Sequence, residues 1–184
     1  MKKILIIATS LLLFLGIFVV TSNSKQKSKD AFLSKYNLQT ETIKNTIEYL
    51  DGSEIKPVQL GAQITSEALV MNDGKENHTF STKDEDFYLS FAPYQYNTHP
   101  CFDHIPTGCQ GEMINTEVEV IVYDEKGNVV YSGTETTATN GFAGIWLSRN
   151  IKGTITVKYD DQVAVSDFGT YKTDGTCLTT LQLV

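Results

Sequence analysis

Three cysteines are the residues of this chain whose types and spacing could do chemistry. Cys101 and Cys109 lie eight positions apart in one loop, and Cys177 follows 68 positions later. Because the count is odd, any pairing into disulfides leaves at least one thiol over, which is unusual for a protein outside the cytosol. Three sulfurs that converge on one point would instead form a site for a soft metal ion.

The three sulfurs suit copper, whereas the histidines beside them do not settle which metal binds. Cu(I) is soft and is satisfied by two or three sulfur ligands, whereas Zn(II) requires four ligands. His99 and His104 flank Cys101 and are candidate auxiliary donors for either metal, and Met113 is a further soft donor nearby in the sequence. The loop contains no Lys or Arg that would stabilise a free thiolate, which favours metal binding over nucleophilic catalysis. We therefore expect Cu(I) at the three cysteines, with zinc as the alternative.

The same thiols also permit redox chemistry. Oxidation of a cysteine pair to a disulfide releases two electrons, which could reduce two Cu(II) ions to Cu(I) before the protein captures them. Two alternatives without copper stay open from the residues alone. In the first, a Cys101–Cys109 disulfide exchanges with Cys177 in a thiol–disulfide redox protein. In the second, that disulfide only closes a short loop and stabilises a cell-surface binding module by about 2–3 kcal/mol.

None of these hypotheses makes the chain a conventional enzyme. The sequence offers no argument for a Ser-His-Asp arrangement, a nucleotide-binding loop or a paired-carboxylate site. We expect a binding protein whose redox activity, if it has one, is a stoichiometric reduction of Cu(II) by thiols. Its formal charge is −7, and −9 without the two lysines of the first three residues. An acidic surface repels nucleic acid and anionic lipid, so neither is an expected partner.

Short strands must position the cysteines. Period-two alternation and turn residues predict strands over 66–71, 78–81, 86–91, 117–123, 128–133, 142–147, 153–159, 162–168 and 177–183. In the last strand, Cys177, Thr179, Leu181 and Leu183 share one face, so we expect the thiol to point towards the interior or the mouth of the domain. Prolines and glycines exclude regular structure from the cysteine loop, which can then fold back on itself.

The strand pattern and the N-terminal region together define the expected fold class. Residues 1–24 begin with positive charge, continue with an apolar run and end with small residues, which is the pattern of an export signal. We expect this segment to be either a cleaved signal peptide or a membrane anchor. Residues 25–56 are expected to hold a polar tether and helices, with Thr40 as a cap and an apolar stripe at Ile43, Ile47 and Leu50. Residues 57–184 would form the β-rich domain. We expect a mainly β chain with an N-terminal helical region (α+β) and an antiparallel β-sandwich-like domain.

Three segments resemble the CueP family of bacterial extracytoplasmic copper-binding proteins. They are THPCFDHIPTGCQGEM around the first two cysteines, GFAGIWL, and DGTCLTTLQL around the third. The resemblance extends from about Phe32 to Val184 and includes the spacing of the three cysteines.

This resemblance implies a function and a set of partners. Cys101, Cys109 and Cys177 would be the copper ligands and the redox group of a protein for copper resistance. The protein would act in the periplasm or at the outer face of the cell membrane, and would pass copper to a client such as a superoxide dismutase. The resemblance also implies a homodimer with an N-terminal helical region and a β-rich C-terminal part.

Overall fold

The computed structural model describes residues 26–38, 42–53 and 59–184. The chain separates into two compact units, residues 1–40 and 41–184. In the first unit residues 26–35 form a helix, so the polar residues predicted as a tether belong to a helix from residue 26 onwards. The predicted export signal and Thr40 lie outside the described residues. Among the residues that are described, no helix has both the length and the apolar character needed to cross a membrane.

The second unit begins with helix α2, which spans Ile43–Gly52. Thr42 is its N-cap, and the Thr42 side chain accepts a backbone hydrogen bond from the first turn at 3.2 Å. Of the predicted stripe, Ile47 and Leu50 are fully buried, whereas Ile43 is half-buried. Asp51 is buried as well, at 4% exposure, because the last turn of α2 faces the β-rich part of the same unit. A buried carboxylate requires partners, and these lie in the functional site described below.

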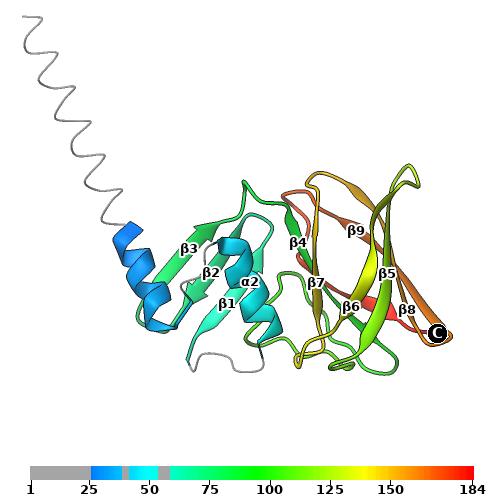
Figure 1. Cartoon of the computed structure of the whole chain (residues 1–184), viewed down its shortest axis with the longest axis horizontal. Helices are drawn as coiled ribbons and strands as arrows, with labels where there is room; N and C mark the ends of the chain where they lie inside the picture. Colours follow the sequence, from blue (N-terminus) through cyan, green and yellow to red (C-terminus); the bar gives the residue numbers. More distant parts are fainter. Residues whose placement is uncertain (1–25, 39–41, 54–58) are drawn as a thin grey trace, which may run out of the picture. The chain divides into compact units, whose positions relative to one another are not determined.

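Ten strands form three sheets in the described part of the chain (Figure 1). The strands are β1 (Gly61–Thr65), β2 (Ala68–Asn72), β3 (Asn77–Ser81), β4 (Phe87–Tyr94), β5 (Glu117–Asp124), β6 (Val129–Thr136), β7 (Ala143–Leu147), β8 (Lys152–Tyr159), β9 (Gln162–Gly169) and β10 (Cys177–Gln182). The sheet orders are β1-β2-β3, β10-β4-β7 and β6-β5-β8-β9. All paired strands are antiparallel except β10 and β4, which are parallel. The predicted fold class is confirmed: the chain is mainly β with an N-terminal helical region.

The sheets β10-β4-β7 and β6-β5-β8-β9 pack face to face and share one hydrophobic core. The core side chains of the sheet β10-β4-β7 are Phe87, Leu89, Phe91, Ala143, Ile145, Leu147 and Leu181. Those of the facing sheet are Val118, Val120, Val122, Ile155, Val157, Ala164 and Phe168. These residues alternate along each strand with residues on the other face, as expected for a sandwich in which each sheet buries one face.

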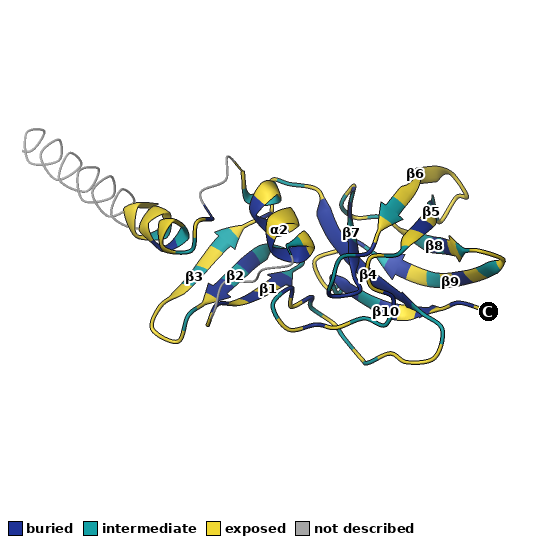
Figure 2. Ribbon diagram, turned by 60° about the horizontal axis from the view of Figure 1, so that its bottom comes forward, coloured by how far each residue is buried: buried dark blue, intermediate teal, exposed yellow. Residues whose placement is uncertain are grey.

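Strand β4 is buried on both faces, as the dark blue ribbon in Figure 2 shows. One face enters the sandwich core, while the other carries Tyr88, Ser90 and Ala92. Tyr88 and Ser90 hydrogen-bond to Asp51 of α2, and Ala92 packs with cysteines of the loop. The second face of β4 is therefore the floor on which the helix and the cysteine loop meet.

Candidate metal centre

The cysteine loop connects β4 to β5 and is tied by backbone hydrogen bonds to three other segments. The pairs are Ile64 N–H to His104 O (2.8 Å), Cys177 N–H to Phe102 O (3.0 Å) and Gly111 N–H to Asn140 O (2.6 Å). They fix the loop to β1, to the first residue of β10 and to the turn before β7. An irregular segment with its backbone satisfied in this way can hold side chains in fixed positions.

The third of these ties depends on two glycines. Gly141 has a positive φ of +75°, and a Cβ at this position would lie 2.5 Å from the backbone carbonyl of Gly111. Gly111 is equally constrained, because its own Cβ would lie 2.5 Å from the carbonyl oxygen of Gly141. The two backbones can approach only because neither residue has a side chain.

The structure brings the three cysteine sulfurs together, all within 4.8 Å of one another. Cys101 and Cys177 form a disulfide with their Cα atoms 5.6 Å apart, while Cys109 is free and buried. The Cys109 sulfur lies 3.7 Å from that of Cys101. The Cys101–Cys109 disulfide considered from the sequence is therefore not the bond that forms. Cys177 is the partner because its backbone hydrogen bond to Phe102 places it directly beside Cys101.

Cys109 is held by a tight turn of its own loop. The N–H groups of Gly108 and Cys109 both donate to the carbonyl of Ile105, at 2.9 and 2.8 Å, and the Ile105 N–H points back at the Cys109 sulfur at 3.4 Å. Burial raises the pKa of the Cys109 thiol, but hydrogen bonds from His104 and the Ile105 backbone outweigh burial, so the pKa is lowered. A buried imidazole thus supplies the positive neighbour that is missing among the Lys and Arg residues of the loop.

His104 is fully buried and lies between the sulfurs and a carboxylate. Its Nδ1 is 3.9 Å from the Cys177 sulfur, and its Nε2 is 2.7 Å from Oδ1 of Asp51. Burial lowers the pKa of His104, but the charge and hydrogen bond of Asp51, with a smaller contribution from Cys109, raise it to about 9. Its ring packs against that of Phe142 with centroids 4.6 Å apart.

Asp51 accepts hydrogen bonds from three further side chains. They are Tyr88 Oη (2.6 Å), Ser90 Oγ (3.2 Å) and Asn140 Nδ2 (2.9 Å). Burial raises the pKa of Asp51, yet the His104 charge and the hydrogen bonds from His104, Tyr88 and Asn140 together lower it to about 2. Asp51 is therefore ionised and accepts only, so the hydrogen between it and His104 must belong to Nε2. A hydrogen bond to an acceptor-only carboxylate fixes which ring nitrogen faces the sulfurs.

The other candidate donors lie in different positions. The His99 ring stacks on Phe142 with centroids 6.1 Å apart, and its buried Nδ1 is without a hydrogen-bond partner among the described residues. A neutral imidazole can offer this nitrogen to a ligand in the tautomer that carries its hydrogen on Nε2. Met113 is packed in the sandwich core, whereas Cys109 and Cys177 belong to a separate cluster with Phe142.

The acidic residues of the loop have structural partners. The Glu112 carboxylate accepts the backbone N–H groups of Gln95, Tyr96 and Asn97 at 2.9 to 3.0 Å, which lowers its pKa and fixes the start of the loop. Asp103 accepts from the Gln63 side chain at 3.1 Å. Asp51 is the carboxylate that reaches the centre, and the sequence alone did not single it out.

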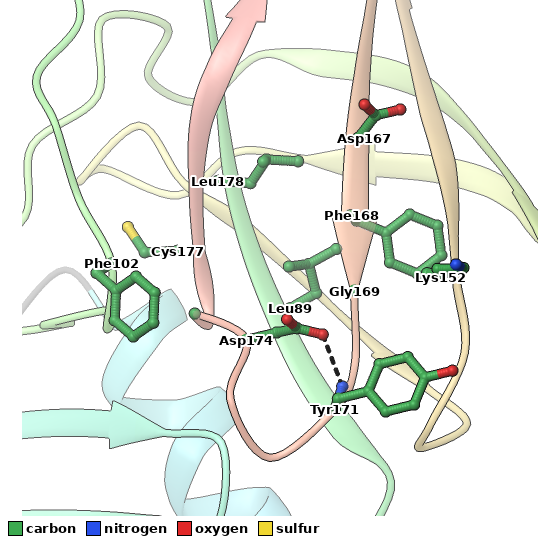
Figure 3. A pocket seen from close by; sticks show the side chains of 11 residues that line it. Leu89, Phe102, Lys152, Asp167, Phe168, Gly169, Tyr171, Asp174, Cys177 and Leu178 are labelled. Atoms are coloured by element: carbon green, nitrogen blue, oxygen red, sulfur yellow. Dashed lines mark hydrogen bonds between the residues drawn. The ribbon is translucent and has the colours of Figure 1, made fainter.

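A pocket of about 410 Å³ lies beside the disulfide and is bordered by Cys177. Figure 3 shows Phe102 next to Cys177 on one side of this pocket, with Phe168, Lys152 and Tyr171 on the other. Phe102 is 64% exposed although it follows Cys101 directly. The three cysteines therefore lie near the surface on the β10 side. On the α2 side, the buried pair of Asp51 and His104 separates them from solvent.

The donor set fits copper when the disulfide is reduced. Three thiolates and an imidazole are the ligands that a soft or borderline ion prefers. In the disulfide form two of the three sulfurs are bonded to each other, which leaves Cys109 and the histidines. Reduction of Cys101–Cys177 is thus the step that would complete the site.

Comparisons with known proteins agree with this chemistry. The model of the family described as "Periplasmic copper-binding protein CueP" matches residues 45–182. A solved structure described as the crystal structure of S.CueP is similar, with a TM-score of 0.80 and 41% identity over 85% of this chain and 99% of that one. A search of curated proteins finds no match. The matched region contains all three cysteines, His104 and Asp51, so the chain belongs to the CueP family of periplasmic copper-binding proteins.

Proposed function

We propose that the reduced protein captures Cu(I) outside the cytoplasm through the thiolates of Cys101, Cys109 and Cys177. The observation that carries this proposal is the convergence of the three sulfurs within 4.8 Å of one another. Reduction of the Cys101–Cys177 bond consumes two electrons and two protons and yields two thiols beside the free Cys109. Three thiolates then surround one point, which suits Cu(I) and excludes harder cations.

His104 is the first auxiliary donor in this proposal. Its Nδ1 faces Cys177 at 3.9 Å, so a modest shift would bring the nitrogen and the sulfurs to one ion. His99 is the second, because its buried Nδ1 makes no hydrogen bond in the described part of the chain. A nitrogen donor would also let the site hold Zn(II), the less favoured metal, since zinc requires four ligands.

The same residues support a stoichiometric reduction of Cu(II). In this step the Cys101 and Cys177 thiolates each give one electron to a Cu(II) ion, and the two sulfurs join in the disulfide. Two Cu(II) become two Cu(I), and the protons of the two thiols are released. The bond between Cys101 and Cys177 is the product that this reaction would give, which supports the proposal. An external thiol donor must reduce it before the next cycle, so the protein would be a reactant and not a catalyst.

A thiol–disulfide exchange role is the second candidate. The Cys109 sulfur lies 3.7 Å from Cys101, close enough for its thiolate to attack the Cys101 sulfur and release the thiolate of Cys177. In this hypothesis copper is incidental and the protein exchanges disulfides with other proteins. The proximity of His104, which lowers the pKa of Cys109, supports both candidates.

The family membership supports further parts of the proposal. We place the mature chain in the periplasm or at the outer face of the membrane, exported by residues 1–24 as signal peptide or anchor, with residues 25–56 as a helical region and 57–184 as the copper-binding domain. Copper would then pass to an extracytoplasmic enzyme such as a superoxide dismutase, and the protein would act as a homodimer in copper resistance.

An anaerobic Cu(I) titration against a competing chelator tests the proposal. The reduced protein should hold about one copper per chain. Cys177→Ser and Cys109→Ser should each lose the competition with the chelator, and His78→Gln, at a histidine outside the loop, should bind as the unchanged protein does. Binding that is indifferent to Cys177, together with turnover of a disulfide substrate, would instead support the exchange role.

A further inference from the structure

Helix α2 contributes a buried carboxylate to a centre whose cysteines all lie elsewhere. Asp51 is 4% exposed and contacts His104, Tyr88, Ser90 and Asn140 through its two oxygens. None of these contacts is to a cysteine. Among these hydrogen bonds, the one to the imidazole ring of His104 connects the carboxylate to the sulfur group.

The contacts divide between the two carboxylate oxygens. Oδ1 is shared by His104 Nε2 at 2.7 Å and Asn140 Nδ2 at 2.9 Å, whereas Oδ2 accepts from Tyr88 and Ser90. Asn140 also accepts the backbone N–H of Phe142 at 3.0 Å, and the Phe142 ring packs on His104. The segment 140–142 therefore holds the imidazole of His104 in two ways. Asn140 supports the Asp51 oxygen that binds the ring edge, and Phe142 packs on the ring face.

The hydrogen bond determines what His104 presents to the sulfurs. An acceptor-only carboxylate requires Nε2 to carry a hydrogen, which leaves Nδ1 as the atom that faces Cys177. A ring rotated by half a turn about its Cβ–Cγ bond would present the carbon Cε1 to the carboxylate and the carbon Cδ2 to the Cys177 sulfur, so both contacts of the ring nitrogens would be lost. Carboxylates that hold metal-binding histidines from behind in this way orient the ring and strengthen the ligand.

We propose that Asp51 is a positioning residue of the copper site, which holds His104 with Nδ1 directed at the sulfurs and so makes α2 part of the binding centre. This inference rests on the proposed function, because it assigns Asp51 a role in a site formed by the cysteines and His104. It explains why a charged residue occupies the buried end of a helix that carries no ligand itself. A charge pair that only stabilised the fold would not require Nδ1 of His104 to face the sulfurs.

The test compares two substitutions in the same polar cluster. Asp51→Asn keeps the size of the side chain but removes its charge, and the amide can present an N–H to Nε2 where the carboxylate presents an acceptor. Tyr88→Phe removes a hydrogen bond to the opposite oxygen, Oδ2, and leaves Oδ1 with His104. Any loss that comes from weakening the buried cluster should affect both variants.

Two readouts are required, one of which needs no metal. The first is ¹⁵N NMR of the ring nitrogens of the three histidines in the reduced, metal-free protein, assigned with His104→Gln. The second is the Cu(I) affinity of each reduced variant against a chelator. We expect Asp51→Asn to change the His104 ring signals and to weaken Cu(I) binding by roughly 10- to 100-fold. Tyr88→Phe should leave both close to the unchanged protein.

The outcomes separate this inference from the proposed function. If the unchanged protein fails to bind Cu(I), the proposed function fails whatever the NMR signals show. If it binds Cu(I) and Asp51→Asn binds equally well with unchanged His104 signals, the positioning role is wrong. Equal losses in Asp51→Asn and Tyr88→Phe would also overturn it, because they would show that the cluster only stabilises the fold. Should Asp51→Asn fail to fold, Asp51→Glu keeps the charge but displaces the oxygens from Nε2, so it should change the same His104 signals and weaken Cu(I) binding, and unchanged signals and binding in Asp51→Glu would overturn the positioning role.

Discussion

The sulfur of Cys109 lies 3.7 Å from that of Cys101, which is itself bonded to Cys177. Cys101 is thus in contact with both other cysteines. Its sulfur is the atom that the Cys109 thiolate can attack and from which the Cys177 thiolate can leave. This arrangement makes the three residues one connected thiol–disulfide system and gives Cys109 a role in both candidate functions.

The arrangement predicts which disulfides form in cysteine variants. In Cys177→Ser, the only neighbour left for Cys101 is Cys109, so air oxidation should produce a Cys101–Cys109 bond. In Cys109→Ser, the Cys101–Cys177 bond should form as in the unchanged protein. Peptide mapping by mass spectrometry under non-reducing conditions checks both. A Cys177→Ser protein that keeps two free thiols after oxidation would contradict the prediction.

The Asp51–His104 pair predicts a pH dependence of stability in the oxidised, metal-free protein. The pKa of Asp51 is lowered from 3.8 to about 2, so its contribution is complete above 3.8 and is lost as the pH falls through about 2. The pKa of His104 is raised from 6.5 to about 9, so its contribution is complete below 6.5 and is lost as the pH rises through about 9. The pair therefore stabilises the folded protein most between pH 3.8 and pH 6.5.

Asp51→Asn measures this contribution through urea unfolding across pH. The free energy of unfolding should fall by roughly 2 kcal/mol near pH 6, and this difference should shrink as the pH rises towards 9. Tyr88→Phe leaves the charge pair in place, so its cost should stay constant over the same range. A cost of Asp51→Asn that is independent of pH would show that the pair is not charged in the folded protein.

Several strands of the sandwich could be predicted because they bury one face. Alternating patterns in β5, β8 and β9 mark those strands, and the hairpin across Asp160 was predicted with correct strands on both sides. The face of β10 that carries Cys177 was also predicted correctly. The short edge strand β1 was missed, because Gly61 and Ala62 have low strand propensity and Ile64 is its one large apolar residue.

The long-range pairings could not be obtained from periodicity. The parallel pair of β4 and β10 joins residues more than 80 positions apart, and no local pattern specifies such a partner. The same limit applies to the centre. The cysteines and His104 were candidates by residue type, but Asp51 resembled an ordinary polar residue at a helix end. Only its burial beside His104, Tyr88 and Asn140 reveals its role.

The single arginine of the chain predicts a stability effect away from the centre. The Arg149 guanidinium donates to the backbone carbonyls of Ser66, Thr82 and Glu85 at 2.6 to 2.7 Å, and so ties the β1-β2-β3 sheet to the end of β7. Lysine cannot reproduce three donors in a planar arrangement. Arg149→Lys should therefore lower the free energy of unfolding by about 1–3 kcal/mol and speed amide exchange in β2 and β3.

A surface lysine in the same region provides the control. Lys83 forms an ion pair with Glu67 at 3.4 Å, but its side chain is 59% exposed. Exposed pairs of this kind contribute little, so Lys83→Gln should change the unfolding free energy by less than about 1 kcal/mol. Equal effects of the two substitutions would mean that Arg149 acts as a general surface charge and not as a bridge between segments.

Gly144 in β7 leaves the space in which Tyr88 lies. A Cβ on Gly144 would overlap the Tyr88 ring and hydroxyl, so Gly144→Ala must move the ring and weaken its hydrogen bond to Asp51. We expect a loss of about 1–3 kcal/mol of unfolding free energy, measured by urea denaturation. In a Tyr88→Ala background the overlap is gone, so adding Gly144→Ala should cost little. Gly52→Ala is the matched control, because a Cβ there has open space within 4 Å. A Gly144→Ala cost that persists without the tyrosine ring would place its origin in the strand backbone and not in this contact.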